Sequence, residues 1–293
     1  MSASGWAQRP EAVTILVFGS TGQVGIELAK LDGVRSLSRA QADLENPEAC
    51  AALIRETHCA AVINAAAYTA VDKAEEDEAR AQVINGDAPA AMAQAAAAKV
   101  IPFVHISTDY VFEGGGETPF TPSDPTGPLG AYGRTKLTGE DAVRAAGGAN
   151  AILRTSWVFS AHGNNFVKTM LRLAETRDAL TVVGDQHGGP TPAAAIAGAC
   201  HTIAHQLADA PEKSGTYHFA GTPDTTWADF ARAVFAEAGE AVSVEDIPTS
   251  GYPTPAARPL NSRMDCSATA AAFGIKRPDW RAHLKQVIAQ LRS

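Results

Sequence analysis

Short apolar runs alternate with helix-like stretches through the first half of the chain, and this alternation is the strongest constraint on its fold. Such runs are typical of strands buried on both faces, as in a parallel sheet. Strands that alternate with helices are joined by right-handed crossovers, which place helices on both faces of the sheet. The expected strands are 12–19, 34–38, 60–64, 101–107 and 150–159, and the expected helices are 22–31, 46–57 (capped by Asn46), 87–99 and 132–146.

The last third of the chain is interrupted by glycine- and proline-rich segments at 184–192, 221–226 and 248–259. It still contains two amphipathic helices, expected at 226–239 and 279–291. We therefore expect an α/β fold, a Rossmann-like doubly wound parallel sheet with a smaller, irregular C-terminal cap that binds substrate. The dinucleotide-binding domain would comprise residues 1–157 with 180–220, and the cap residues 158–179 with 221–293.

The composition argues against several classes of function. The formal net charge is −8, whereas a protein that binds nucleic acid needs clustered basic residues. No segment approaches the roughly 18 uninterrupted apolar residues of a membrane helix, and residues 1–12 lack the apolar region of a signal peptide. The four cysteines are scattered, with no C-x-x-C pair. We expect a reduced, cytoplasmic protein that acts on a small molecule, with no nucleic-acid or membrane partner.

The segment GSTGQVG at 19–25 joins the first expected strand to the first expected helix. Gly19 allows a sharp turn off the strand, Gly22 lets the backbone approach a pyrophosphate, and Gly25 lets the helix pack close to the sheet. The spacing G-x-x-G-x-x-G differs from the commoner G-x-G-x-x-G motif. Its position between a strand and a helix nevertheless favours a nucleotide site over an ordinary turn.

The end of the second expected strand bears on which dinucleotide binds. An acidic residue there would bind the ribose 2′-hydroxyl and repel a 2′-phosphate, but the segment SLSR ends in Arg39 with no acid beside it. Arg39 is either a ligand for the 2′-phosphate, which would favour NADPH over NADH, or a solvated surface arginine. Both interpretations stay open, and Asp43 is expected nearer the adenine.

Tyr132 and Lys136 lie four residues apart on an expected helix and therefore share one face. A tyrosine normally titrates near pH ~10, and a neighbouring ammonium group lowers the pKa of the phenol because it favours the phenolate. Thr108, at the end of the fourth strand, offers a second hydroxyl to the same substrate oxygen. These three side chains predict a catalytic site that polarises a carbonyl group for hydride transfer from a nicotinamide.

Segments along almost the whole chain resemble the extended short-chain dehydrogenase/reductases, and within them the dTDP-4-dehydrorhamnose reductase family. The segments are GSTGQVG, VINAAAYTAVDKAE, NGDAP, STDYVFEG, PLGAYGRTKLTGE, RTSWVF, NFVKTML, GDQHGGPT and ARPLNSRMD. The resemblance implies NAD(P)H-dependent reduction of the 4-keto group of a dTDP-linked 6-deoxy sugar, the last step of dTDP-L-rhamnose biosynthesis. It implies that Tyr132 donates the proton, that Lys136 sets the pKa of Tyr132 and holds the ribose, and that Thr108 tunes the site.

The resemblance also implies which residues contact the two ligands. The dinucleotide contacts would be Gly22, Gln23, Val24, Asp43, Leu44, Ala67, Tyr68 and Thr69, together with Tyr132 and Lys136. The nucleotide-sugar contacts would be Thr108, Asp109 and Trp157, with Tyr110 shaping the sugar pocket. Related 4,6-dehydratases carry Asp-Glu after this threonine. Because Tyr110 cannot serve as a carboxylate base, we expect reduction and not dehydration.

Two further side chains have two interpretations each. Arg258, in a loop stiffened by Pro259, is the preferred contact for the diphosphate of the substrate, with Arg263 as the alternative. Glu27 is a solvated helix acid, which we favour, or, as in some members of the family, a ligand for Mg²⁺ between the subunits of a homodimer.

Two alternatives to this reductase stay open. The first is a non-catalytic binding subunit, because the regulatory subunit of methionine adenosyltransferase resembles the same family. The second is a reductase of a related nucleotide sugar, because recognition of the base depends on the irregular cap.

Overall fold

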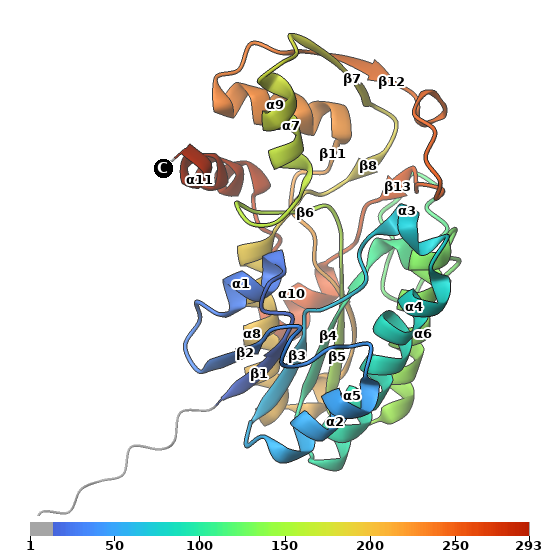
Figure 1. The fold of residues 1–293 in the computed structure, drawn as a ribbon, viewed down its shortest axis with the longest axis vertical. Helices are drawn as coiled ribbons and strands as arrows, with labels where there is room; N and C mark the ends of the chain where they lie inside the picture. Colours follow the sequence, from blue (N-terminus) through green and yellow to red (C-terminus); the bar gives the residue numbers. More distant parts are fainter. Residues whose placement is uncertain (1–13, 293) are drawn as a thin grey trace, which may run out of the picture.

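The computed structural model describes residues 14–292, in which a parallel six-stranded sheet carries a smaller cap at one end (Figure 1). The strands of the sheet are β1 (Ile15–Phe18), β2 (Val34–Leu37), β3 (Ala61–Asn64), β4 (Phe103–Thr108), β5 (Asn150–Thr155) and β10 (Gly215–His218). Their order is β2-β1-β3-β4-β5-β10, and every neighbouring pair is parallel. The expected doubly wound α/β fold is confirmed. Residues 1–12, considered above for a signal peptide, lie outside the described residues.

Helices cover both faces of the sheet, because successive strand residues point to opposite faces (Figure 1). Ile15 and Val17 pack toward one helical layer, and Leu16 and Phe18 pack toward the other. The first layer is α1 (Gln23–Leu28), α8 (Ala193–Asp209) and α10 (Ser267–Phe273). The second layer is α2 (Pro47–Glu56), α5 (Ala88–Ala98) and α6 (Ala131–Ala146). Three short elements lie between α2 and α5 in the chain: α3 (Val71–Ala74), α4 (Glu78–Gln82) and the π-helical turn Val83–Asp87. Asn46 caps α2 as expected, since its side chain accepts the Ala49 N–H.

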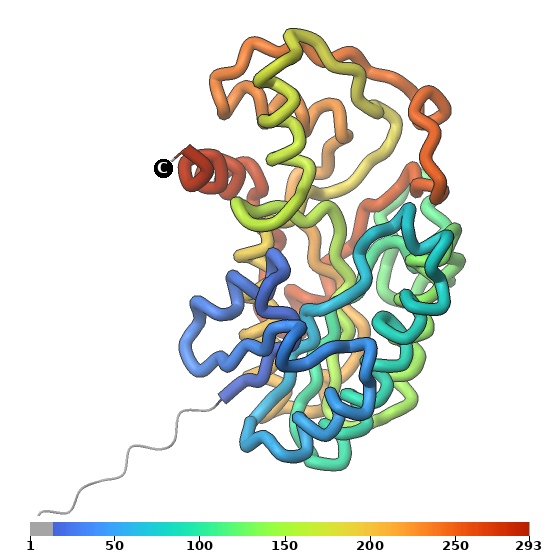
Figure 2. Tube along the Cα trace, viewed as in Figure 1, coloured from blue at the N-terminus to red at the C-terminus, as the bar shows by residue number. Residues whose placement is uncertain are grey.

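The cap has its own apolar core, built around Phe230, Phe235, Trp280 and Leu284. Its helices are α7 (Phe166–Ala174), α9 (Trp227–Ala238) and α11 (Trp280–Arg292), and its short strands are β6 (Val158–Phe159), β7 (Ala179–Val183), β8 (His187–Gly188), β9 (Thr191–Pro192), β11 (Thr225–Thr226), β12 (Ser243–Ile247) and β13 (Asn261–Ser262). The chain passes repeatedly between the sheet and the cap (Figure 2). The two amphipathic helices expected in the last third are therefore α9 and α11 of the cap.

The pairing of the short strands differs from the expected division of the chain. That division places residues 180–192 with the sheet domain, but β7 pairs with β12, and β8 pairs with β11 and β13. It places α10 with the cap, but Phe273 packs in the core between the sheet and α8. Both segments are short and apolar enough for either core, so only long-range contacts decide their place. We propose that 179–192 belong to the cap and 267–273 to the sheet domain.

Two further observations concern the cysteines and the apolar character of the helices. All four cysteines are free and buried. Within residues 14–292, no helix has both the length and the apolar character needed to cross a bilayer.

A buried ion pair holds α6 against β5. Arg154 donates to both carboxylate oxygens of Glu140, at 2.9 and 2.6 Å, and their side chains are 3% and 0% exposed. Burial raises the pKa of Glu140, but the paired guanidinium more than offsets this effect, so the pKa lies below its usual range. Breaking such a pair by removing one partner typically costs about 3–5 kcal/mol, because the other charge stays buried.

The turn between β1 and α1 leads to a prediction about stability. A Cβ atom on Gly25 would lie 1.9 Å from the Gly19 carbonyl oxygen, whereas a Cβ atom on Gly198 in α8 would have no neighbour within 4 Å. We expect Gly25→Ala to lower the free energy of unfolding by about 1–3 kcal/mol or more, because the backbone at Gly19 must move to make room for the Cβ atom. The control, Gly198→Ala, should raise it by about 0.5–1 kcal/mol. Urea denaturation measures both, and a Gly25→Ala protein as stable as wild type would contradict the close contact.

Candidate active site

A cavity of about 780 Å³ opens where the carboxyl ends of the strands meet the cap. Its place is consistent with the general rule that ligands of such sheets bind where the strand order reverses, here between β1 and β3. The residues singled out from the sequence that line it are Gly19, Gly22, Gln23, Val24, Arg39, Asp43, Leu44, Ala67, Thr69, Thr108, Asp109, Tyr110, Tyr132, Lys136 and Trp157. Gly25, Tyr68, Arg258 and Glu27 are not among the residues that line it.

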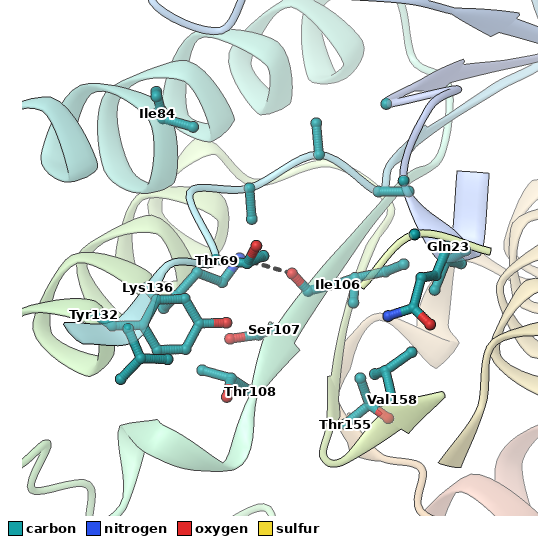
Figure 3. A pocket seen from close by; sticks show the side chains of 18 of the residues that line it. Gln23, Thr69, Ile84, Ile106, Ser107, Thr108, Tyr132, Lys136, Thr155 and Val158 are labelled. Carbon is teal, nitrogen blue, oxygen red and sulfur yellow. Dashed lines mark hydrogen bonds between the residues drawn. The ribbon is translucent and has the colours of Figure 1, made fainter. Parts of the chain in front are cut away.

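The glycine-rich turn forms one wall of the cavity. Gly19 adopts φ +102°, a conformation that a side chain would strain. A Cβ atom on Gly22 would approach only the Gly19 carbonyl oxygen, at 3.6 Å, so this backbone is open to a ligand. Gly25 instead packs on the turn, which explains why it does not line the cavity. Gln23 lies across the cavity from Tyr132 (Figure 3). Its side-chain Oε1 accepts hydrogen bonds from the Ser160 hydroxyl at 2.8 Å and from the Asn165 amide at 3.0 Å.

Buried hydroxyl groups on the floor of the cavity lack partners. Within the described chain, Thr155 Oγ1 and Ser156 Oγ make no hydrogen bond, and both residues line the cavity. A buried hydroxyl without a partner is costly unless a ligand or water satisfies it. Together with the open backbone at Gly22, these atoms fit a polar ligand that extends from the glycine turn toward Tyr132.

Arg39 lies at the edge of the cavity, among carboxylates. Its Nε donates to Asp43 at 3.2 Å, and its Nη2 pairs with Glu45, which also accepts from Arg80 at 2.6 Å. The Arg39 side chain is 60% exposed. Hydrogen bonding from the Glu45 backbone, and less strongly from Arg39, lowers the pKa of Asp43. A 2′-phosphate at Arg39 would therefore have to compete with two carboxylates.

Tyr132 and Lys136 both reach the cavity from α6. The Tyr132 hydroxyl points into the cavity near Ser107 (Figure 3). Desolvation raises the pKa of Tyr132 to about 12, and the Thr108 hydroxyl offsets this only in part. Lys136 is not among the groups that shift this pKa, so its expected effect on Tyr132 stays a prediction. At neutral pH the phenol keeps its proton.

Lys136 is instead anchored to β4. Its Nζ donates to the Ile106 carbonyl oxygen at 2.7 Å, a contact drawn in Figure 3, and lies 3.1 Å from His105 Nε2. Only 1% of the lysine is exposed. Burial lowers the pKa of Lys136 to about 8, with Glu140 acting in the opposite direction. The lysine therefore has a fixed position in the wall of the cavity.

Thr108 connects the phenol of Tyr132 to a buried acid. The Thr108 hydroxyl donates to Asp109 Oδ1 at 3.0 Å and accepts the Tyr110 N–H at 3.2 Å. Burial raises the pKa of Asp109 to about 6, although hydrogen bonds from Ser262 and Thr108 lower it in part. The Tyr110 ring meets the Tyr132 ring edge-on, with centroids 5.5 Å apart. This cluster places two hydroxyl groups, from Thr108 and Tyr132, on one side of the cavity.

Trp157 and Trp227 close the cavity on the cap side. Trp157 has φ +49°, which is uncommon for a residue other than glycine. Its ring stacks on Trp227 with centroids 3.6 Å apart, and Gly188 contacts the same ring. Trp227 Nε1 donates to Gln186 at 3.1 Å. Sequence reasoning missed Trp227, because no motif surrounds it and its place depends on how α9 packs.

Two residues singled out from the sequence have partners outside the cavity. Tyr68 donates its backbone N–H to Asn85 at 2.8 Å, and its partly buried side chain packs against the core instead of lining the cavity. The expected contact of Arg258 with a diphosphate stays a prediction, and its guanidinium pairs with Asp72 of α3 at 2.7 Å. This pair ties the loop before β13 to the sheet domain. Neither contact involves residues close in sequence, so neither could be read from a motif.

Glu27 shows no sign of a metal site. Its carboxylate pairs with Lys30 at 2.8 Å and with His162 at 3.0 Å. Among residues 14–292, no three His, Cys, Asp or Glu side chains gather as metal ligands would. The contacts of Glu27 fit the favoured interpretation of a helix acid. Its side chain is only 12% exposed, so it is less solvated than expected.

The buried Asp109 predicts a pH dependence of stability. Its pKa is raised in the folded protein, so the wild type loses stability as pH rises from the unfolded value near 3.8 through about 6. Asp109→Asn removes this ionisation. From about pH 4 to pH 7, we expect the stability of the variant to gain on the order of 2–3 kcal/mol relative to wild type. Urea denaturation at the two pH values tests this, and an unchanged difference between the proteins would contradict it.

Comparison with known proteins agrees with the resemblance noted from the sequence. Residues 13–293 match the family described as RmlD substrate binding domain. A dTDP-4-dehydrorhamnose reductase from Burkholderia thailandensis is 46% identical over 283 residues, which cover 91% of this chain and 95% of the relative.

Solved structures give the same result. The crystal structure of a dTDP-4-dehydrorhamnose reductase from Clostridium acetobutylicum has a TM-score of 0.89 and 37% identity, covering 96% of this chain and 100% of the other. The crystal structure of dTDP-4-dehydrorhamnose reductase from Bacillus anthracis in complex with NADP has a TM-score of 0.87 and 31% identity. The match covers 95% of this chain and 99% of the other. The family match and these identities over nearly the full length establish that the chain belongs to the dTDP-4-dehydrorhamnose reductase family.

Proposed function

We propose that this protein uses NADPH or NADH to reduce the 4-keto group of a dTDP-linked 6-deoxy sugar, which gives dTDP-L-rhamnose. The observation that carries this proposal is the protonated Tyr132 beside Thr108, facing a glycine-rich turn across one cavity. Membership of the dTDP-4-dehydrorhamnose reductase family supports the substrate, and the NADP bound to the Bacillus anthracis relative supports the cofactor.

The side chains of the site suit a carbonyl reduction. When bound, the nicotinamide supplies a hydride to C4 of the sugar. Tyr132 gives its proton to O4, and it holds that proton at neutral pH because its pKa is about 12. If its proton turns from Asp109 Oδ1 toward the substrate, the Thr108 hydroxyl donates a hydrogen bond to the same oxygen and so stabilises the negative charge that develops there. Lys136 is fixed by β4 and lies one helical turn from Tyr132. We propose that it holds the ribose.

The remaining residues give the site its selectivity. Tyr110, whose pKa burial raises, is not a base, so the pair Asp109–Tyr110 lacks the second carboxylate that a 4,6-dehydratase uses. We propose that Asp109, Tyr110 and Trp157 contact the sugar nucleotide. We propose that Arg258 contacts the diphosphate of the substrate and also holds the loop before β13 through Asp72. A homodimer and a cytoplasmic location remain predictions from the sequence, and we do not propose Mg²⁺.

The alternative of a non-catalytic binding subunit has less support. Such a subunit has no need of a donor hydroxyl pair, yet Tyr132 and Thr108 face the cavity together. Oxidation of NADPH with a panel of 4-keto-6-deoxy nucleotide sugars separates the hypotheses. Turnover with the dTDP-linked sugar supports the proposal, turnover with another nucleotide sugar identifies a related reductase, and no turnover with any of them favours the binding subunit.

The two neighbouring tyrosines give a matched pair of variants. We expect Tyr132→Phe to lower kcat by at least about 100-fold, because the proton donor is lost while the ring packing is kept. Tyr110→Phe should instead raise KM and change kcat much less. Steady-state and single-turnover kinetics measure these effects, with dinucleotide binding as a check on folding. Near-normal turnover in Tyr132→Phe would show that Tyr132 is not the proton donor. A collapse of hydride transfer in Tyr110→Phe would assign that role to Tyr110 instead.

The cofactor preference depends on Arg39. If its guanidinium leaves Asp43 and Glu45 to bind a 2′-phosphate, Arg39→Ala should weaken NADPH by about 10-fold and NADH far less. Arg80→Ala is the matched control, because Arg80 also pairs with Glu45 but does not line the cavity. This control should leave both affinities nearly unchanged. Titration of each variant with NADPH and with NADH measures these affinities. If Arg39→Ala weakens the binding of NADPH and NADH equally, Arg39 is only a surface charge.

A further inference from the structure

The side chain of Gln23 is held by two hydrogen bonds at one end of its amide, and the other end is turned to the cavity. Its Oε1 accepts from the Ser160 hydroxyl at 2.8 Å and from Asn165 Nδ2 at 3.0 Å. Neither bond uses Nε2, which Figure 3 shows on the open side of the cavity. Because an amide NH₂ group only donates, Gln23 presents a hydrogen-bond donor to a ligand in this part of the cavity.

The orientation of Asn165 is fixed by the backbone around it. Its Oδ1 accepts the Lys168 N–H at 3.2 Å, as the N-cap of α7, and an N–H group requires an oxygen there. Its Nδ2 faces the carbonyl oxygens of Ser160 at 2.8 Å and His162 at 3.2 Å, and carbonyl oxygens only accept. Each end of the Asn165 amide therefore has a single assignment.

This assignment determines which end of Gln23 faces Asn165. The Asn165 NH₂ group has no lone pair, so a Gln23 nitrogen at 3.0 Å from it would place a donor against a donor. An oxygen in this place accepts from Asn165 and from the Ser160 hydroxyl. The segment 160–168 at the start of α7 thus sets, through Asn165, the direction of an amide on the glycine-rich turn.

The charged groups next to this network pair with one another. His162 Nε2 lies 3.0 Å from Glu27 Oε1, and Glu27 Oε2 accepts from Lys30 at 2.8 Å. These three residues are not among those that line the cavity, whereas Gln23 is. The donor that the network directs into the cavity is therefore the uncharged amide of Gln23.

Gln23 lies between the two ends of the site. It follows Gly22, whose open backbone suits a pyrophosphate, and it faces Tyr132 across the cavity. A dinucleotide that extends from the turn toward Tyr132 would pass Gln23 between its pyrophosphate and its nicotinamide ring. The acceptor for Gln23 Nε2 would then be an oxygen of the nicotinamide half.

We infer that Asn165 is a positioning residue for the dinucleotide: it turns the Gln23 amide so that Nε2 donates to an oxygen of the nicotinamide half. The inference rests on the proposed function, because its ligand is the dinucleotide of that reaction. Since Asn165 also caps α7, one side chain serves both the start of this helix and the cofactor site.

A double-mutant cycle in the full-length protein tests the inference, with dissociation constants measured by titration with NADH and no substrate present. Asn165→Ser keeps an oxygen that can cap α7 but removes the amide that reaches Gln23. Gln23→Met keeps an unbranched side chain without the amide. We expect Gln23→Met to weaken NADH binding about 10-fold and Asn165→Ser about 3-fold, which are effects on the scale of one hydrogen bond. In the Gln23→Met background, Asn165→Ser should weaken NADH binding no further.

The cycle separates this role from a structural one. Gly163 and Asn164 line the cavity, so Asn165 could affect binding by shaping its own segment. In that case Asn165→Ser would weaken NADH binding by the same factor with Gln23 and with Gln23→Met, and this result would overturn the inference. If Asn165→Ser fails to fold, Asn165→Thr takes its place, because threonine also caps helices and fills more of the space.

Two further ligands locate the contact on the dinucleotide. NADPH should be weakened by the same factors as NADH, because the 2′-phosphate lies on the adenosine half. AMP, which lacks the nicotinamide half, should bind Asn165→Ser and Gln23→Met as it binds the wild type. An equal loss of affinity for AMP would overturn the inference.

The titrations also separate failure of the inference from failure of the proposed function. A wild-type protein that binds neither NADH nor NADPH would contradict the proposed function and the inference together. A wild-type protein that binds both dinucleotides, with additive losses in the cycle, would contradict the inference alone.

Discussion

Helix α6 buries a lysine and a glutamate one turn apart, and the arrangement of the site depends on how these two groups are satisfied. An unpaired buried charge costs several kcal/mol, so each group needs a specific partner. Glu140 takes Arg154 from β5, and Lys136 takes the Ile106 carbonyl oxygen and His105 from β4. These partners dock α6 on the ends of two adjacent strands. Tyr132, on the same helix, is thereby placed beside Thr108 at the end of β4.

The site joins parts of the chain that lie far apart in sequence. The glycine-rich turn after β1 and the hydroxyl pair of Tyr132 and Thr108 form opposite sides of one cavity. Trp227 of the cap completes it by stacking its indole on that of Trp157. Gln23 of the turn is hydrogen-bonded to Ser160 and Asn165, so the turn is tied directly to the start of α7. A ligand bound along the turn would therefore touch a segment that also positions the cap.

Desolvation, more than the neighbouring ammonium, controls the protonation of the site. It keeps the Tyr132 phenol protonated and draws the pKa of Asp109 upward while it draws that of Lys136 downward. At neutral pH the Tyr132 phenol is therefore a neutral group that can donate a hydrogen bond. Such a donor suits a carbonyl oxygen that gains negative charge as it is reduced, because the donor is already oriented before the charge develops.

Much of this could be predicted from the sequence, because the relevant patterns are local. Alternating strands and helices, the glycine turn at 19–25 and the pair Tyr132–Lys136 each involve residues close together in the chain, so their geometry follows from backbone periodicity. The tertiary structure alone decided the partners of Lys136 and Arg258, the pairing of β7 and β8 with β12, β11 and β13, and the contribution of Trp227. These depend on contacts between residues that are distant in sequence, and on burial, which sets pKa values that no sequence pattern encodes.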